Sequence, residues 1–381
     1  MEWKEVRLGD ILNFRRGHDL PHSAMKPGNI PVAGSNGVIG YHDTATPIKP
    51  ILTIGRSGNV GKPYFYEEAW AHNTTLYVDD FKGNDPKFLY YLCQTMPFAN
   101  FVGGSAVPTL NRNHIHPLET KIPVKVEDQR RIASILSSLD RKIELNNKIN
   151  ADLEEMAQTI FKNWFVDFEP FKDGKFVDSE LGMIPEGWKV GRLDEIADVV
   201  GGSTPSKAKS EYYTQKGIAW LTPKDLSNHP AVYTSRGEID ITEEGYNSTS
   251  TKLMPKGTIL FTSRAPIGYV SIAQNDICTN QGFKSLVPKK AGTCFLYCFL
   301  KYVTPVIENK STGSTFKEAS GSLVKSLQVI MPEQIVFEDF ETIMLPLFAR
   351  IESLEKENSR LSLLRDTLLP RLMSGELEVP E

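Results

Sequence analysis

The chain has 381 residues, of which 40% are hydrophobic and 24% are charged, a composition typical of a globular protein with room for two sizeable cores. No apolar run approaches the roughly 18 residues that a membrane span requires, and the sequence from Met1 onward lacks the pattern of a signal peptide. These features exclude a membrane-spanning protein, and we expect a cytoplasmic protein without membrane contacts.

The formal net charge of −4 is unevenly distributed along the chain. Residues 1–124 hold 12 basic and 11 acidic residues, residues 188–332 hold 17 and 12, and residues 333–381 hold 5 and 11. Neutral-to-basic segments are compatible with DNA binding and acidic segments with protein contacts. A preference of helices for Glu explains the same division equally well.

Residues 1–124 form the first predicted module, in which strands dominate. Short apolar runs between clusters of Gly, Pro and Asn predict the strands, and a stretch rich in Phe, Leu and Tyr predicts one helix. The strands are expected at 51–54 and 75–78, the helix at 86–96 and a closing extended segment at 118–123.

Residues 125–167 have a different pattern. Apolar residues recur there at alternating steps of three and four, from Ile132 to Trp164. This spacing predicts a helix of about 36 residues, or about 54 Å, with one apolar stripe that must be buried. A linker follows at 168–187.

Residues 188–332 form a second predicted module, and residues 333–381 a second helical segment with a C-terminal tail. The expected strands lie at 258–261 and 269–272, the helix at 293–303 and the closing segment at 327–332. The second apolar stripe runs from Phe340 to Leu372, with Pro346 as a candidate kink.

The two halves of the chain are similar in sequence. Matching pairs include Trp3-Lys4 with Trp188-Lys189, Ile51-Leu52 with Ile259-Leu260, and Ile143-Glu144 with Ile351-Glu352. Repeats at such long range imply the order module–helix–module–helix. We predict an α+β fold in which two mixed modules are separated by two long helices, which form an antiparallel coiled coil with a pseudo-two-fold internal repeat.

Asn150 and Asn358 occupy equivalent positions near the midpoints of the two stripes. A polar residue in a helical seam lowers stability but penalises wrong registers. These asparagines are therefore candidates for fixing the helix register, with exposure to solvent as the alternative.

Motifs for catalysis are missing. The sequence has no phosphate-binding loop, dinucleotide fingerprint, nucleophile elbow or zinc-protease motif. Glu308-Asn309-Lys310 resembles half of a nuclease site, but no Pro-Asp precedes it. The four cysteines (Cys93, Cys278, Cys294 and Cys298) lack zinc-site spacing and are interpreted as buried thiols. We expect a non-catalytic chain that holds no metal and no cofactor.

Polar, glycine-rich loops at matching places in the two modules are candidate DNA-binding sites. Glycine lets the backbone approach a phosphate, Arg pairs with phosphate or guanine, and Asn and Gln pair with adenine. The candidates are Arg15, Arg16, Asn36, Arg56, Ser57, Asn59, Lys62, His72, Asn73, Arg112, Ser203, Thr204, Lys207, Lys224, Arg264, Asn280, Gln281, Ser314 and Lys317. A purely structural turn is the alternative for each loop.

Several stretches resemble the specificity subunit of type I restriction–modification systems. They are Gly201–Ser206 (GGSTPS), Ser263–Gly268 (SRAPIG), the linker Trp164–Pro170 (WFVDFEP) and the ending Leu368–Leu377 (LLPRLMSGEL). The resemblance covers the whole chain, although no GGSTPS-like motif follows Trp3 in the first module.

The resemblance implies a DNA-recognition subunit, with each module a target-recognition domain for half of an interrupted site and the helices as spacers. A pair of modification (methyltransferase) subunits would bind S-adenosylmethionine and methylate adenine. Restriction subunits would use ATP and Mg for translocation and cleavage. Open alternatives are a related system with a fused restriction–modification partner, a self-sufficient methyltransferase or nuclease, and a coiled-coil protein-binding scaffold.

Overall fold

The computed structural model describes residues 1–103, 109–311 and 317–379. The chain divides into two compact units, residues 1–144 with 358–381 and residues 145–357. Each unit contains one predicted module together with a part of both helical segments. The sequence analysis instead treated each helical segment and the linker as a separate part of the chain, with boundaries at 124, 167, 187 and 332.

The first unit is built on an antiparallel sheet with the strand order β2-β8-β5-β6. Its strands are β1 (Trp3–Arg7), β2 (Asn13–Arg16), β3 (Ile30–Gly34), β4 (Gly37–His42), β5 (Ile51–Gly55), β6 (Pro63–Tyr66), β7 (Trp70–Ala71), β8 (Thr75–Asp80), β9 (Val102–Gly103), β10 (Thr109–Leu110) and β11 (Glu119–Pro123). Its short helices are α1 (Leu8–Ile11), α2 (Pro86–Thr95) and α3 (Arg112–Ile115). The expected strands at 51–54 and 75–78 and the helix at 86–96 match β5, β8 and α2 closely.

The second unit is built on a mixed sheet with the order β15-β23-β20-β21-β18. Its strands are β12 (Phe176–Ser179), β13 (Gly182–Pro185), β14 (Lys189–Arg192), β15 (Ala197–Gly201), β16 (Tyr213–Thr214), β17 (Trp220–Leu221), β18 (Tyr233–Thr234), β19 (Asp240–Ile241), β20 (Ile259–Ser263), β21 (Ile267–Ala273), β22 (Cys278–Thr279), β23 (Lys284–Pro288) and β24 (Gln328–Met331). Its shorter helices are α5 (Pro223–Asn228), α6 (Glu243–Asn247), α7 (Thr293–Lys310) and α8 (Gly321–Lys325). The helix expected at 293–303 is longer, because α7 continues through Pro305.

The two sheets have corresponding strand orders. The order β2-β8-β5-β6 corresponds to β15-β23-β20-β21, and in each unit the first and last strands of the module also pair antiparallel, β1 with β11 and β14 with β24. A short parallel pair occurs in each as well, β3 with β7 and β17 with β22. These correspondences follow the sequence repeat.

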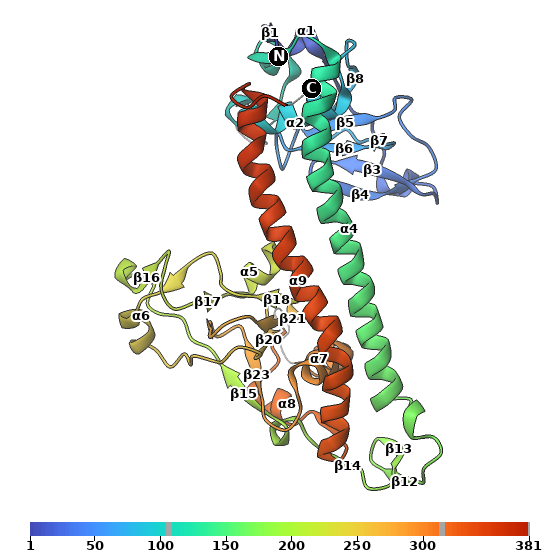
Figure 1. The fold of residues 1–381 in the computed structure, drawn as a ribbon, viewed down its shortest axis with the longest axis vertical. Coiled ribbons are helices and arrows are strands. Elements are labelled where there is room, and N and C mark those ends of the chain that lie inside the picture. Colours follow the sequence, from blue (N-terminus) through green and yellow to red (C-terminus); the bar gives the residue numbers. More distant parts are fainter. Residues whose placement is uncertain (104–108, 312–316, 380–381) are drawn as a thin grey trace. The chain divides into compact units, whose positions relative to one another are not determined.

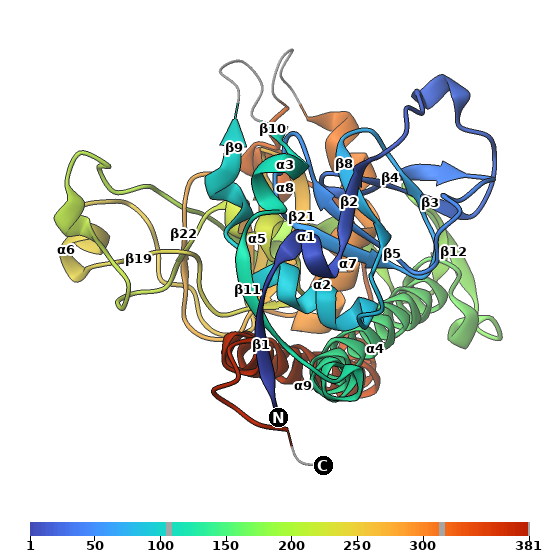
Figure 2. The ribbon, with the colours of Figure 1, turned by 90° about the horizontal axis from the view of Figure 1, so that it is seen from above.

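The long helices are α4 (Val126–Phe165) and α9 (Gln334–Met373), each of 40 residues. Both begin six residues before the first residues of the predicted stripes, Ile132 and Phe340, and α9 continues through Pro346. Within each unit, a segment of α4 lies beside a segment of α9 (Figure 1), and Figure 2 shows the segments of the first unit nearly end-on. Nowhere in the described part of the chain is a helix both long enough and apolar enough to span a bilayer.

In both units the helix segments run in opposite directions. In the first unit, Arg365 Nη1 donates to Asp140 Oδ1 at 2.8 Å, and the same carboxylate accepts from Tyr91 Oη of α2 at 2.6 Å. In the second unit, Phe161 packs against Phe340, with 6.3 Å between ring centroids, whereas the earlier residue Asn146 contacts the later residue Glu357. The buried faces of these segments carry the predicted stripes.

Asn146 is the fully buried asparagine of the α4 stripe, at 0% exposure. Its Nδ2 donates to Glu357 Oε2 of α9 at 2.9 Å. Asn150 and Asn358, the candidates for fixing the helix register, are both half-buried and belong to different units. This interhelical hydrogen bond involves a residue one turn before Asn150.

Two carboxylates of α9 attach the helix to the second module through backbone hydrogen bonds. Glu341 accepts from Cys294 N at 3.2 Å and Phe295 N at 2.8 Å, in the first turn of α7. Glu355 accepts from Val232 N at 2.7 Å and Tyr233 N at 3.0 Å, at strand β18. Burial raises the pKa of Glu355 to about 7, although both backbone hydrogen bonds lower it. Burial likewise raises the pKa of Glu341.

The four cysteines are buried and free. Burial raises the pKa of the Cys93 thiol to about 12 and that of Cys278 to about 11. Such thiols are weak nucleophiles at neutral pH.

We predict that Glu355 makes the stability of the chain depend on pH. Because its folded pKa of about 7 lies above the ordinary value of 4.5, the folded state binds the proton more tightly between these values. The contribution of Glu355 is therefore complete below pH 4.5 and is lost as the pH rises through 7.

The check is the free energy of unfolding in urea, measured at intervals from pH 4.5 to 8. Glu355→Gln should remove a negative slope of at most about 1.4 kcal/mol per pH unit. The exposed Glu338, on the same helix, provides the control Glu338→Gln, which should keep the slope of the unmodified chain. Identical slopes for the unmodified chain and Glu355→Gln would contradict the prediction.

Candidate DNA-binding surface

In the second module, four of the predicted residues line one hollow of about 1110 Å³. They are Lys207, Lys224, Arg264 and Asn280. They lie after β15, at the start of α5, after β20 and after β22, so the hollow collects loops from distant parts of the module. Aromatic and acidic side chains that the sequence did not single out share its wall, namely Tyr213, Trp220, Asp225 and Glu238.

Backbone contacts hold the GGSTPS loop against the turn that follows β22. Ser203 N donates to Thr279 O at 3.0 Å, and Ser203 O accepts from Trp220 Nε1 at 3.1 Å. A Cβ at Gly202 would lie 2.1 Å from Thr279 O, so this close approach requires glycine. The Thr204 hydroxyl donates to Gln281 Oε1. Ser203 and Thr204 thus support the loop structure in this conformation.

The amide of Asn280 has a partner inside the turn. Its Oδ1 accepts from Gly282 N at 2.8 Å, which leaves its amino group for a ligand in the hollow. A bidentate contact with adenine needs the amide oxygen and the amino group together. Because an amide oxygen has two lone pairs, such a contact by Asn280 would share Oδ1 between the base and Gly282 N. Gln281 beside it is exposed.

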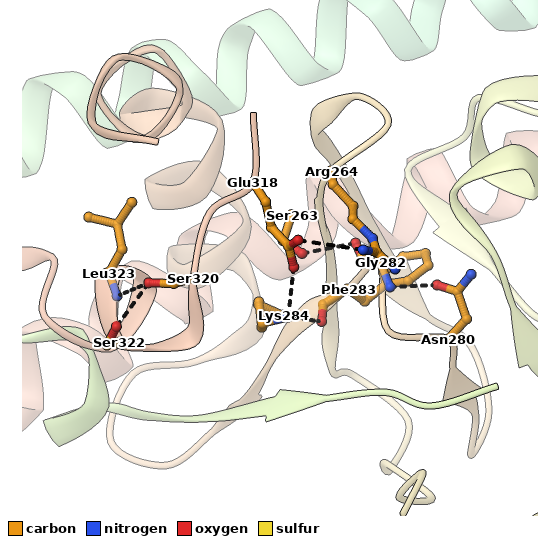
Figure 3. A network of polar contacts seen from close by, with 10 residues as sticks. All are labelled: Ser263, Arg264, Asn280, Gly282, Phe283, Lys284, Glu318, Ser320, Ser322 and Leu323. Carbon is orange, nitrogen blue, oxygen red and sulfur yellow. Dashed lines mark hydrogen bonds and ion pairs between the residues drawn. The ribbon is translucent and has the colours of Figure 1, made fainter. Parts of the chain in front are cut away.

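Arg264 lines both this hollow and a second one of about 650 Å³. Its Nη1 lies 3.5 Å from Glu318 Oε2, and Lys284 Nζ lies 3.9 Å from the other oxygen of the same carboxylate (Figure 3). Lys317 lines the second hollow and donates from Nζ to Glu308 O at 3.3 Å. Ser314 lies outside the described residues.

In the first module, three loops meet at one carbonyl oxygen, that of Thr74. It accepts from Arg56 N at 2.8 Å, from Ser57 N at 3.3 Å and from Ser35 Oγ at 2.8 Å. The turn with Asn36, the loop with Arg56 and Ser57, and the turn with His72 and Asn73 are thereby held together. Leu110 N donates to Arg56 O at 2.8 Å and adds the segment that leads to Arg112.

Several candidates of the first module have partners within the protein. Arg112 Nη1 donates to Phe14 O at 3.2 Å, and Arg15 Nε lies 3.3 Å from Asp79 Oδ2. Asn73 donates to Asp19, and His72 Nδ1 lies 3.0 Å from Thr74 Oγ1. Burial lowers the pKa of His72, which favours its neutral form.

The remaining candidates of this module are more accessible. Arg16, Asn36, Asn59 and Lys62 are exposed, and Arg56 is half-buried. The Lys62 ammonium lies 5.4 Å from the centroid of the Tyr64 ring. These residues could therefore meet a polyanion without breaking an internal ion pair.

Both surfaces carry the kinds of side chain that bind nucleic acids. Cationic and amide side chains lie on loops whose frames are built from backbone hydrogen bonds, an arrangement that suits contacts with phosphates and base edges. In the described ranges, no group of three or more His, Cys, Asp and Glu residues could hold a metal ion.

Comparison with known proteins assigns the family. The family model described as the type I restriction modification DNA specificity domain matches residues 1–155 and 185–357. The chain belongs to this family.

Relatives of this chain are named as specificity subunits of type I restriction enzymes. It is 41% identical over 187 residues to the type I restriction enzyme MjaIX specificity subunit of Methanocaldococcus jannaschii, a match that spans 48% of this chain and 43% of the relative. It is 26% identical over 445 residues to the type I restriction enzyme HindI specificity subunit of Haemophilus influenzae, spanning 98% of this chain and 94% of that one. The crystal structure of a type I restriction-modification system S subunit from M. genitalium shares the fold, with a TM-score of 0.63 at 18% identity over 98% of this chain and 96% of that one.

We predict that Arg264→Ala and Arg56→Ala weaken DNA binding by the specificity chain without unfolding it. If the arginine pairs with guanine, its loss should cost about 1–3 kcal/mol of binding free energy at one base position. If it holds a phosphate, its loss should lower affinity for all sequences and flatten the salt slope by about one. Titration of duplexes at several salt concentrations measures both effects.

Arg350→Ala provides the control, because Arg350 is an exposed arginine of α9 outside these loops. It should bind DNA like the unmodified chain. Unchanged affinity in both loop variants would remove these arginines from the candidate surface.

Proposed function

We propose that this specificity chain is the non-catalytic subunit that recognises an interrupted DNA target. Residues 1–124 and 188–332 would be target-recognition domains that each read one half of it. The observation that carries the proposal is the frame of the loops, which backbone hydrogen bonds assemble at Thr74 O in one domain and at Thr279 O in the other. Such a frame holds cationic and polar side chains in place for phosphate and base-edge contacts.

The long helices would act as the spacer between the domains. The opposed helix segments of each unit fit a continuous antiparallel coiled coil, and the corresponding strand orders fit a pseudo-two-fold repeat. Each helix would have a length of about 60 Å at 1.5 Å per residue. In a coiled coil of this kind, helix length determines the distance between the half-sites.

Partner subunits would carry out the methylation and the cleavage. A pair of modification subunits would bind S-adenosylmethionine and methylate adenine in both half-sites, and restriction subunits would use ATP and Mg to cleave unmodified DNA. The chain itself would hold no cofactor and would act on DNA in the cytoplasm. The family assignment and the polar, cation-bearing loops support this division of work.

The proposal is tested by expressing the chain with the modification subunits of its own system and sequencing the methylated host DNA. We expect methyladenine at an interrupted motif only when the chain is present. A continuous motif, or methylation without the chain, would contradict the proposal. The purified chain alone, incubated with DNA and a labelled methyl donor, should transfer no label.

The repeat predicts that half-site recognition can be exchanged. Replacing residues 188–332 with the second module of another specificity subunit should change one half of the methylated motif and leave the other half and the spacer unchanged. The reciprocal exchange of residues 1–124 serves as the control and should change the opposite half. A simultaneous change of both halves would show that the modules do not read independently.

The spacer role predicts that helix length sets the gap in the target. Four residues inserted after Asn147 add about 6 Å and roughly 40° beyond a full turn. Since one base pair rises about 3.4 Å, the preferred gap should lengthen by one or two base pairs with both half-sites retained. Methylated genomic sites in cells with the variant report this gap.

A one-residue insertion at the same point is the matched control. It turns apolar stripe positions outward and should lower stability and activity instead of shifting the gap. An active four-residue variant with an unchanged gap would assign the spacing to the module linkers.

A further inference from the structure

In the second module, a carboxylate lies between two cations, one of which, Arg264, lines the hollow. Glu318 Oε2 is 3.5 Å from Arg264 Nη1, and Glu318 Oε1 is 3.9 Å from Lys284 Nζ (Figure 3). The segment of Glu318 is fixed to the strand that precedes Arg264, because Ala319 N donates to Ser263 O at 2.9 Å. The fold thus places the Glu318 carboxylate beside Arg264, although the two residues are far apart in the sequence.

The cluster has a net positive charge with unequal exposure of its members. The Lys284 side chain is 18% exposed, that of Arg264 37% and that of Glu318 43%. Lys284 Nζ also donates to Phe283 O at 3.4 Å. Burial lowers the pKa of Lys284, while Glu318 raises it and Arg264 lowers it. Without the carboxylate, the two cations would repel each other and the long Arg264 side chain would lose its fixed partner.

A carboxylate on a DNA-binding surface also has a cost. It repels phosphates and so weakens the sequence-independent part of DNA binding. A negative charge beside a candidate DNA-binding arginine therefore lowers affinity unless another effect of the carboxylate offsets this loss. Orientation provides one, since an arginine held by a carboxylate offers its remaining N–H groups in a defined direction.

We propose, on the basis of the function proposed above, that Glu318 is a positioning residue that aims Arg264 at one group of the target DNA and suppresses phosphate binding by Arg264 and Lys284 elsewhere. Glu318 would raise discrimination between sequences while lowering affinity for random DNA. This pair of opposite effects distinguishes positioning from a merely structural role, which would weaken both kinds of binding together.

The experiment compares Glu318→Gln with the unmodified chain, each as the full chain with its modification subunits. The target duplex is first selected from a random pool with the unmodified complex. For Glu318→Gln, binding of random duplex should tighten about threefold when measured near 0.2 M salt, and the salt slope should steepen by about one, as for one added phosphate contact. The ratio of target to random affinity should fall at least tenfold.

Glu308→Gln is the matched control. Glu308 lines the second hollow with Arg264, and its side chain makes no ion pair among the described residues. The variant removes the same charge from the same surface, so it should tighten both kinds of binding and leave their ratio unchanged. A fall in the ratio as large as that of Glu318→Gln would mean that charge alone explains the effect, and the inference would be wrong.

A double-mutant cycle tests whether Glu318 acts through Arg264. In an Arg264→Ala background, Glu318→Gln should cause no further loss of discrimination, and thermal melting of each variant checks the fold. A further loss as large as that in the unmodified background would overturn the inference while leaving the proposed function intact. If the unmodified complex selects no sequence from the pool, the proposed function fails, and the inference fails with it.

Discussion

Burial of the apolar stripes of α4 and α9 is the constraint on which the rest of the structure depends. Helices of 40 residues with one apolar face are stabilised mainly by packing of that face. In the second unit, Phe165 of α4 and Phe340 of α9 join the same core as Phe295 of the module, and the Phe165 ring centroid lies 5.0 Å from Phe340 and 4.8 Å from Phe295. In the first unit, Ile132 and Leu372 belong to one core with the module residues. The helices are thus part of each unit's interior, and a change in one of them must also affect a module.

Two half-buried carboxylates on α9 add direction to this apolar packing. An ionised group is costly to remove from water unless hydrogen bonds replace its hydration. Glu341 accepts from backbone N–H groups in the first turn of α7, which have no partner within that helix. Glu355 accepts from two backbone N–H groups at β18. A rotation of α9 against the module would break the four hydrogen bonds between these carboxylates and the backbone. We interpret these contacts as fixing the rotation of the helix, which apolar packing alone determines less sharply.

The sequence predicted the elements that have a period, and it could not predict contacts made between loops. The stripes locate α4 and α9 to within six residues at their starts and to within one residue at their ends, because a buried helix face must repeat its apolar residues. The same period does not say which polar residue of the stripe is fully buried; Asn146 is, and it bonds across to α9, whereas Asn150 is half-buried. Glu318 adjoins the candidate Lys317, but its contact with Arg264 depends on the hydrogen bond between Ala319 and Ser263, which no spacing encodes. The occupied Oδ1 of Asn280 is likewise a consequence of one turn's conformation.

The loop frames explain how one architecture can carry two different surfaces. The bonds that join the loops are made largely by backbone atoms, at Thr74 O in one module and at Thr279 O in the other, so most side chains on the loops can change without loss of the frame. Glycines are the exception where two backbones approach closely, since a Cβ at Gly55 would lie 1.9 Å from Asn59 O and one at Gly202 would lie 2.1 Å from Thr279 O. Substitution at these glycines should damage the frame, whereas substitution at the polar positions around them should alter only what the surface binds. A recognition protein needs this separation, because its specificity then depends on side chains that the fold itself does not require.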